Sequence, residues 1–264
     1  MIQESTWILY QFQFSHYCEK ARWVLQLKNA AFQQINIAPG LHKIIIHCKA
    51  PSVQSPITVP ILIAGDQVIQ GSGPIIDYLD RVIPEKPLGF DQEDLQKECA
   101  ALEYLLNETI ATSLRSIAYT IFLKHRKFLI SFWSLDGPWY CKTWLTIALP
   151  YLERVIERLY KADSDHLAEH ENRFNAGLDH LDKLCESQPF LVGNRFSRCD
   201  LTMASLLAPL NFPKQHPYPN PLPLPDEFQR FCEIHRQRPV LGRVAEIYRE
   251  YRPIWRRESR TQEP

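Results

Sequence analysis

The first part of the chain alternates between short apolar runs and amphipathic stretches of helical period. The first part of the stretch from Trp7 to Leu27 is short and β-prone, with Ile8 and Leu9 next to aromatic side chains, as in a buried strand. From Tyr17 to Leu27, apolar side chains recur at the spacing of one helix face. Residues 32–37 alternate apolar and polar side chains and predict a second strand. Parallel pairing of the two strands through the intervening helix would form a βαβ unit.

The next stretch predicts a loop, a hairpin and a further helix. Residues 39–58 contain several prolines and predict a long loop with one brief helix inside it. Residues 61–69 predict a β-hairpin around a Gly-Asp turn. Ser72 and Pro74 mark the beginning of a helix, because serine caps helices well and proline fits their first turn. The predicted order is therefore βαβ, a loop, and ββα.

The rest of the chain has a helical pattern. The proline-containing residues 84–91 predict a linker, and one long helix should follow them. Residues 115–160 predict two helices interrupted by a Gly-Pro pair, and residues 164–187 predict another helix. Ser197 and Asp200 have the spacing of a capping box at the start of a buried helix.

A last helix is expected over residues 227–251. We therefore predict an α/β N-terminal domain of residues 1–83, a linker of residues 84–91 and an all-α domain of residues 92–264.

Composition narrows the class of protein. The 264 residues include 30 Lys and Arg and 30 Asp and Glu, so the net charge is zero, and no long-range field indicates binding to nucleic acid or to a membrane. The N-terminal residues lack the pattern of a secretion signal, and the apolar runs are about half as long as a membrane span requires. The 7 cysteines form no CxxC pair and indicate reduced thiols rather than a disulfide framework. We expect a soluble, cytoplasmic protein.

The junction between the first strand and the first helix is a candidate anion site. Ser15 stands at the expected N-cap of the helix, and Cys18 falls in its first turn. A helix N-terminus is partly positive and stabilises an anion or a thiolate. His166 and His170 are spaced as two metal ligands on a helix, but no third ligand is near them, so we expect no metal.

Three motifs occur in order in the N-terminal part: SxYCxKxRWxL from Ser15, VPIL from Val59 and GSxxIxxYL from Gly71. At these distances they resemble the N-terminal, thioredoxin-like domain of the glutathione S-transferase superfamily, of the serine/cysteine type. The resemblance implies a thioredoxin-like α/β domain followed by an all-α C-terminal domain. It also implies a homodimer that uses glutathione as a co-substrate in detoxification.

The resemblance assigns residues to glutathione. Val59 would bind the cysteinyl part through its backbone, and Pro60 would follow a cis peptide bond. Gly71 and Ser72 would bind the γ-glutamyl carboxylate, which agrees with the unpaired N–H groups at a helix N-terminus. Lys43 could meet the glycyl carboxylate.

One position departs from the family pattern. Many members have Glu or Gln where this chain has Gly71, so an acceptor for the γ-glutamyl ammonium is missing. Gln70 or Asp77 could substitute, and the sequence does not decide between them.

The thiol of glutathione needs a hydrogen-bond donor. The position that carries the donor in tyrosine-type members is Gln11 here, which cannot play that part, whereas the serine/cysteine-type position falls on Ser15. We therefore expect Ser15 to stabilise the thiolate, with Tyr17 as the alternative. Cys18 keeps only the second position of a thioredoxin-like cysteine pair, so thiol exchange through it is less favoured.

Three functions follow from the resemblance. The first is a glutathione transferase that attacks an electrophilic, apolar substrate bound against aromatic residues of the helical part. The second is a non-catalytic binding or assembly protein with the same fold. The third is a glutathione-dependent thiol oxidoreductase that uses Cys18.

Overall fold

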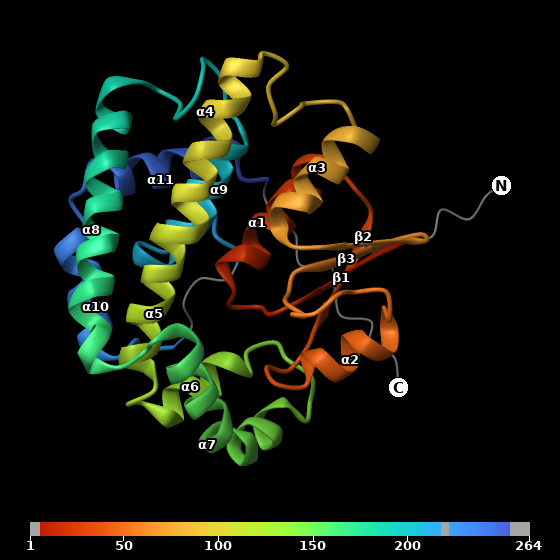
Figure 1. Ribbon diagram of the computed structural model, residues 1–264, viewed down its shortest axis with the longest axis vertical. Helices are drawn as coiled ribbons and strands as arrows, with labels where there is room; N and C mark the ends of the chain where they lie inside the picture. The colour runs from red at the N-terminus through yellow and green to blue at the C-terminus, as the bar shows by residue number, and fades with distance from the viewer. Residues whose placement is uncertain (1–5, 218–221, 254–264) are drawn as a thin grey trace.

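The computed structural model describes residues 6–217 and 222–253, and its N-terminal region contains a four-stranded mixed sheet (Figure 1). The strands lie in the order β2-β1-β3-β4. Their bounds are β1 (Trp7–Gln11), β2 (Phe32–Asn36), β3 (Ile61–Ala64) and β4 (Gln67–Gln70). β1 and β2 are parallel, whereas β1 with β3 and β3 with β4 are antiparallel. The predicted βαβ unit and the predicted hairpin are therefore confirmed.

Three helices cover the two faces of this sheet. They are α1 (His16–Leu27), α2 (His42–Lys49) and α3 (Ser72–Val82). α1 and α3 pack against each other between the sheet and the helical part of the molecule, and α2 lies on the opposite side of the sheet (Figure 1). The brief helix expected within residues 39–58 is α2.

Strand β1 is buried on both faces. Leu9 belongs to the large core that also contains α1 and α3, whereas Tyr10 belongs to a smaller core beneath α2. Successive strand residues point to opposite faces of a sheet, so an apolar run suits a strand that is covered on both sides.

The C-terminal part is mostly helical. Its helices are α4 (Glu93–Tyr104), a π-helix (Leu105–Ile110), α5 (Ala111–Phe122), α6 (Arg126–Trp133), α7 (Cys141–Tyr160), α8 (Ser164–Ser187), α9 (Arg198–Leu207), a short 3-10 helix (Ala208–Leu210), α10 (Asp226–His235) and α11 (Pro239–Tyr251). α9 is the central helix, because it packs on both α1 and α11. The predicted capping box at its start is confirmed: the Ser197 hydroxyl donates to Asp200 at 2.8 Å.

The number of helices was predicted wrongly for two stretches of the chain. The stretch predicted as two helices contains parts of three, because a turn at residues 123–125 separates α5 from α6. The expected last helix is split into α10 and α11, because Pro239 has no backbone N–H and fits the first turn of a new helix. In α3, Gly71 is the N-cap and Ser72 is the first helical residue, so the helix begins one position earlier than predicted.

The cysteines also differ from the expectation. Cys99 of α4 and Cys199 of α9 form a disulfide, with their Cα atoms 6.1 Å apart, so the prediction of reduced thiols throughout was wrong for this pair. The sequence could not reveal the pair, because helix packing alone brings together residues 100 positions apart. Within residues 6–217 and 222–253, no helix has the length and apolar character needed to cross a bilayer.

Candidate functional site

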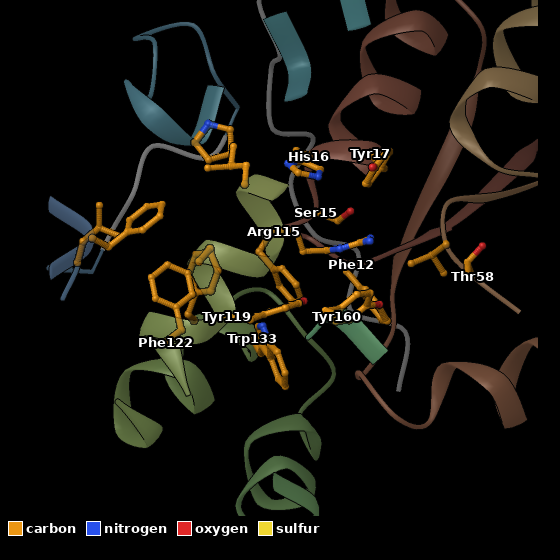
Figure 2. Close-up of a pocket in the computed structure, with 18 of the residues that line it drawn as sticks. Phe12, Ser15, His16, Tyr17, Thr58, Arg115, Tyr119, Phe122, Trp133 and Tyr160 are labelled. Atoms are coloured by element: carbon orange, nitrogen blue, oxygen red, sulfur yellow. The ribbon is translucent and has the colours of Figure 1, made fainter. Parts of the chain in front are cut away.

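Ser15 forms the N-cap of α1, as the sequence predicted. Its backbone is extended, with φ −77° and ψ 125°, and its hydroxyl oxygen accepts from the N–H of Cys18 at 3.4 Å. Because the hydroxyl is the acceptor in that hydrogen bond, its proton can still be donated to a ligand. Ser15 lines a cavity between the sheet region and the helical part (Figure 2).

A cis peptide bond precedes Pro60, which confirms the expectation from the family pattern. The N–H of Gly71 donates to the carbonyl of Pro60 at 2.9 Å and so holds the start of β3 beside the N-terminus of α3. This hydrogen bond brings Val59, Gly71 and Ser72 into one neighbourhood. Val59 lines the cavity, whereas Gly71 and Ser72 do not.

Gly71 has a backbone that only glycine adopts without strain, with φ +96° and ψ 148°. A Glu or Gln at this position would be strained in the same backbone conformation. Of the two proposed substitutes, Asp77 is paired with Arg198. Gln70 donates to the carbonyl of Pro56 at 3.0 Å, and its amide oxygen has no partner among the described residues. Gln70 is therefore the better remaining acceptor.

Lys43 does not reach the cavity. It is exposed on α2, and the neighbouring His42 lines the cavity instead, together with Thr58. Burial lowers the pKa of His42 to about 4, so its imidazole is neutral at neutral pH. Sequence reasoning missed both residues because the irregular segment that carries them gave no periodic pattern.

Tyr17 and Cys18 are engaged elsewhere. The hydroxyl of Tyr17 donates to the carbonyl of Asn107, in the π-helix, at 2.9 Å. Burial raises the pKa of Tyr17 to about 12, so the phenol is a weak acid here. The Cys18 side chain is completely buried, and burial raises the pKa of its thiol. Tyr17 lines the cavity, but its hydroxyl proton is used by Asn107, and Cys18 does not line the cavity.

The cavity has a volume of about 230 Å³ and predominantly aromatic walls. Figure 2 shows Ser15, His16 and Tyr17 at one end and side chains of the helical part at the other. The aromatic residues that line it are Phe12, Phe14, Tyr17, Tyr119, Phe122, Phe132, Trp133, Tyr160, Phe212 and Phe228. Of the tryptophans in the predicted helical residues 115–160, Trp133 lines the cavity, whereas Trp139 is 93% exposed.

Arg115 is the charged residue that the sequence reasoning missed. It extends from α5 into the cavity, on the same helix face as Tyr119 and Phe122, which lie four and seven positions later (Figure 2). An arginine on an otherwise apolar helix face was the available sequence signal. Burial and the charge of Arg115 together lower the pKa of His16 to about 3, so this imidazole is also neutral.

The potential metal ligands do not cluster. His166 forms an ion pair with Asp163 at 2.8 Å, and the buried His170 contacts the carbonyl of Lys161 at 3.2 Å. Within the described parts of the chain, no group of three or more His, Cys, Asp or Glu residues could hold a metal ion.

Comparison with known proteins gives a consistent assignment. Residues 9–87 match the family model for the glutathione S-transferase N-terminal domain. A search of the curated proteins found no match.

Many solved structures share the fold of the whole chain. A glutathione S-transferase of Ceriporiopsis subvermispora, solved in complex with glutathione, is 14% identical, with a TM-score of 0.65; the match covers 94% of this chain and 98% of that one. The glutathione transferase GSTFuA3 from Phanerochaete chrysosporium is 15% identical, with a TM-score of 0.64 and the same coverage. A glutathione S-transferase of Methylobacillus flagellatus with bound glutathione is 18% identical, with a TM-score of 0.59; the match covers 91% of this chain and 93% of that one.

This chain joins a mixed sheet with a cis-proline loop to a mostly helical C-terminal part, and these structures share its fold over at least 91% of its length. Residues 9–87 therefore match the glutathione S-transferase N-terminal domain, and the whole chain has the fold of the solved glutathione S-transferases.

Proposed function

We propose that the protein is a glutathione transferase in which Ser15 stabilises the thiolate of glutathione. The observation that carries the proposal is the position of Ser15: its hydroxyl caps α1 and lines an aromatic cavity that Val59, beside the cis-proline, also lines. Glutathione is proposed as the co-substrate, without a metal. Solved structures of the same fold contain it, including those from Ceriporiopsis subvermispora and Methylobacillus flagellatus.

A hydrogen bond from Ser15 can supply enough free energy to form the thiolate of glutathione near neutral pH. A thiol pKa of about 8.5 must fall toward neutrality, which requires about 1.4 kcal/mol for each unit. A hydrogen bond donated to a charged acceptor contributes about 1.5–3 kcal/mol, so the Ser15 hydroxyl can supply one or two units. The partly positive N-terminus of α1 acts in the same direction.

In the proposed reaction, the sulfur anion attacks an electrophilic carbon of a small, mainly apolar substrate in the aromatic cavity. With an aryl chloride, a carbon–sulfur bond forms and the carbon–chlorine bond breaks. Chloride leaves with the electron pair, and the proton lost from the thiol passes to solvent. The aromatic walls favour such a substrate, because they bury its rings and hold it beside Ser15.

The tripeptide backbone would lie against the sheet. Val59 would bind the cysteinyl part through its backbone, and Ser72 with the N-terminus of α3 would bind the γ-glutamyl carboxylate. Gln70 would accept from the γ-glutamyl ammonium. The same resemblance supports a homodimer in the cytoplasm with a role in detoxification, and light scattering of the purified chain tests the dimer.

Two matched variants test the role of Ser15. Ser15→Ala should bind glutathione and lose turnover of chlorodinitrobenzene by about tenfold to a hundredfold, because one charge-assisted hydrogen bond is lost. Tyr17→Phe should keep its turnover, since the Tyr17 hydroxyl is used by Asn107. Equal turnover of Ser15→Ala and the unmodified protein would remove Ser15 from the mechanism.

A non-catalytic binding protein is the second candidate, and the glycine at position 71 favours it. The backbone at Gly71 leaves no side chain for the γ-glutamyl ammonium, and Asp77 is already paired with Arg198. If millimolar glutathione does not raise the melting temperature, this second function is preferred over the transferase.

A further inference from the structure

The cavity carries one uncompensated positive charge. Arg115 is the only Lys, Arg, Asp or Glu among the described residues that line it. The two histidines in the lining, His16 and His42, have pKa values lowered to about 3 and about 4, so they are neutral at neutral pH. The guanidinium of Arg115 forms no ion pair with any residue in the described parts of the chain.

Two hydrogen-bond donors of residues that line the cavity are unused. The Nε of Arg115 is enclosed and has no acceptor in the described structure. The indole N–H of Trp133, a side chain only 4% exposed, also has no acceptor there. Arg115 and Trp133 both line the cavity (Figure 2). A ligand with an anionic oxygen would pair the Arg115 charge beside these enclosed donors, whereas a pure hydrocarbon would leave that charge unpaired.

The Arg115 guanidinium packs against aromatic rings. Its central carbon lies 4.2 Å from the ring centroid of Tyr160 and 5.9 Å from that of Tyr17. Such cation–π contacts are weak compared with an ion pair at a partly buried arginine. They fix the position of the guanidinium beside the rings but do not neutralise it.

The remaining walls of the cavity determine the size and chemical character of the ligand that it can hold. They are aromatic, and the cavity volume of about 230 Å³ lies below the roughly 300 Å³ at which ordinary ligand pockets begin. A flat molecule with one ring matches this space. An anionic oxygen group on the ring matches Arg115, because the planar guanidinium fork pairs with a carboxylate through two parallel hydrogen bonds.

We propose that the cavity binds small aromatic carboxylates, with the carboxylate on Arg115 and the ring among the aromatic side chains. As the identity of the second substrate, this inference rests on the transferase function proposed above. The binding step itself needs no glutathione, so it can be tested separately.

Calorimetric titration with cinnamate and with its neutral amide, cinnamamide, tests the binding step. The unmodified protein should bind cinnamate at least tenfold more tightly than cinnamamide. Arg115→Gln should remove this preference by weakening cinnamate binding alone, and Arg115→Lys should keep part of it, because lysine retains the charge but not the fork. The matched control is Arg158→Gln, which removes an exposed arginine of α7 outside the cavity and should keep the preference.

The variants should fold, because Arg115 has only ring contacts to lose, and their melting temperatures check this. Equal affinity of the unmodified protein for cinnamate and cinnamamide would overturn the proposal. So would a preference that survives in a folded Arg115→Gln variant, since the guanidinium would then only pack on Tyr160.

A glutathione titration of the same proteins separates this inference from the proposed function. If glutathione fails to bind while the cinnamate preference holds, the transferase proposal fails and the carboxylate site stands. If Arg115→Gln instead weakens glutathione binding and leaves the cinnamate preference unchanged, the guanidinium serves the tripeptide and the carboxylate site is wrong. If the protein turns over such substrates, its kcat/KM for a chloro-nitrobenzoate should exceed that for the corresponding amide by at least tenfold. Arg115→Gln should make the two kcat/KM values equal.

Discussion

The guanidinium of Arg252 donates from Nε to a carboxylate oxygen of Glu19 at 2.8 Å, although the two residues are 233 positions apart. Both side chains are almost completely buried. Glu19 also accepts from Arg22 at 3.0 Å, and the neighbouring Trp23 indole donates to the carbonyl of Tyr251 at 3.2 Å. These contacts join the end of α11 to α1, the helix whose N-terminus forms the candidate site.

Arg252→Met should lower the free energy of unfolding by about 3 kcal/mol, because it leaves a buried carboxylate with one cationic partner fewer. Arg249→Met is the matched control, since Arg249 pairs with Glu250 at the surface and such pairs are worth about 0–1 kcal/mol. Urea denaturation measures both. Equal losses for the two variants would show that the buried pair has no special importance.

The same pair predicts a loss of stability in acid. Burial acts to raise the pKa of Glu19, but Arg252 and Arg22 outweigh it and lower the pKa from 4.5 to about 2. Because the folded-state pKa is lowered, the contribution of Glu19 to stability is fully present above pH 4.5 and is lost as the pH falls toward 2. The difference in unfolding free energy between the unmodified protein and Arg252→Met should therefore shrink over this pH range. A difference that stays constant down to pH 2 would contradict the assignment.

Thiol titration tests the Cys99–Cys199 disulfide. The chain has 7 cysteines, and 5 of them are free in the structure, so denatured, unreduced protein should react at five thiols. Reduction should lower the free energy of unfolding by about 2–4 kcal/mol, because the bridge closes a loop of about one hundred residues in the unfolded chain. Seven reactive thiols in protein purified without reductant would mean that the bridge does not form.

Gly71→Ala should lower the free energy of unfolding by about 1–3 kcal/mol, because its φ of +96° strains any residue with a Cβ. The control is Gly73→Ala at the second residue of the same helix, where a Cβ would meet nothing within 4 Å. That change should be neutral or stabilise by about 0.4–1 kcal/mol. Chemical denaturation measures the free energy of unfolding of both variants. Equal values would show that the backbone at Gly71 relaxes without strain. Gly71→Glu should carry the same strain, so it should not simply restore the family pattern.

The sequence predicted those features that depend on neighbours along the chain. A short run of aromatic and branched apolar residues indicated β1, and alternation indicated β2. The Ser15 cap followed from a preference that acts over one helical turn. The capping box at Ser197 was found for the same reason. The cis peptide before Pro60 came from the resemblance, since local preference alone favours trans.

The tertiary structure decided which side chains meet. The Arg252–Glu19 pair and the Cys99–Cys199 bridge join residues more than ninety positions apart, and no local pattern encodes such pairs. The same holds for the cavity, where packing of α5 against the N-terminus of α1 brings Arg115 near Tyr17. Local preferences act through the backbone over a few residues, whereas a binding site depends on how distant helices pack. For that reason the sequence alone identified Ser15, and the fold was needed to find the charge that faces the cavity.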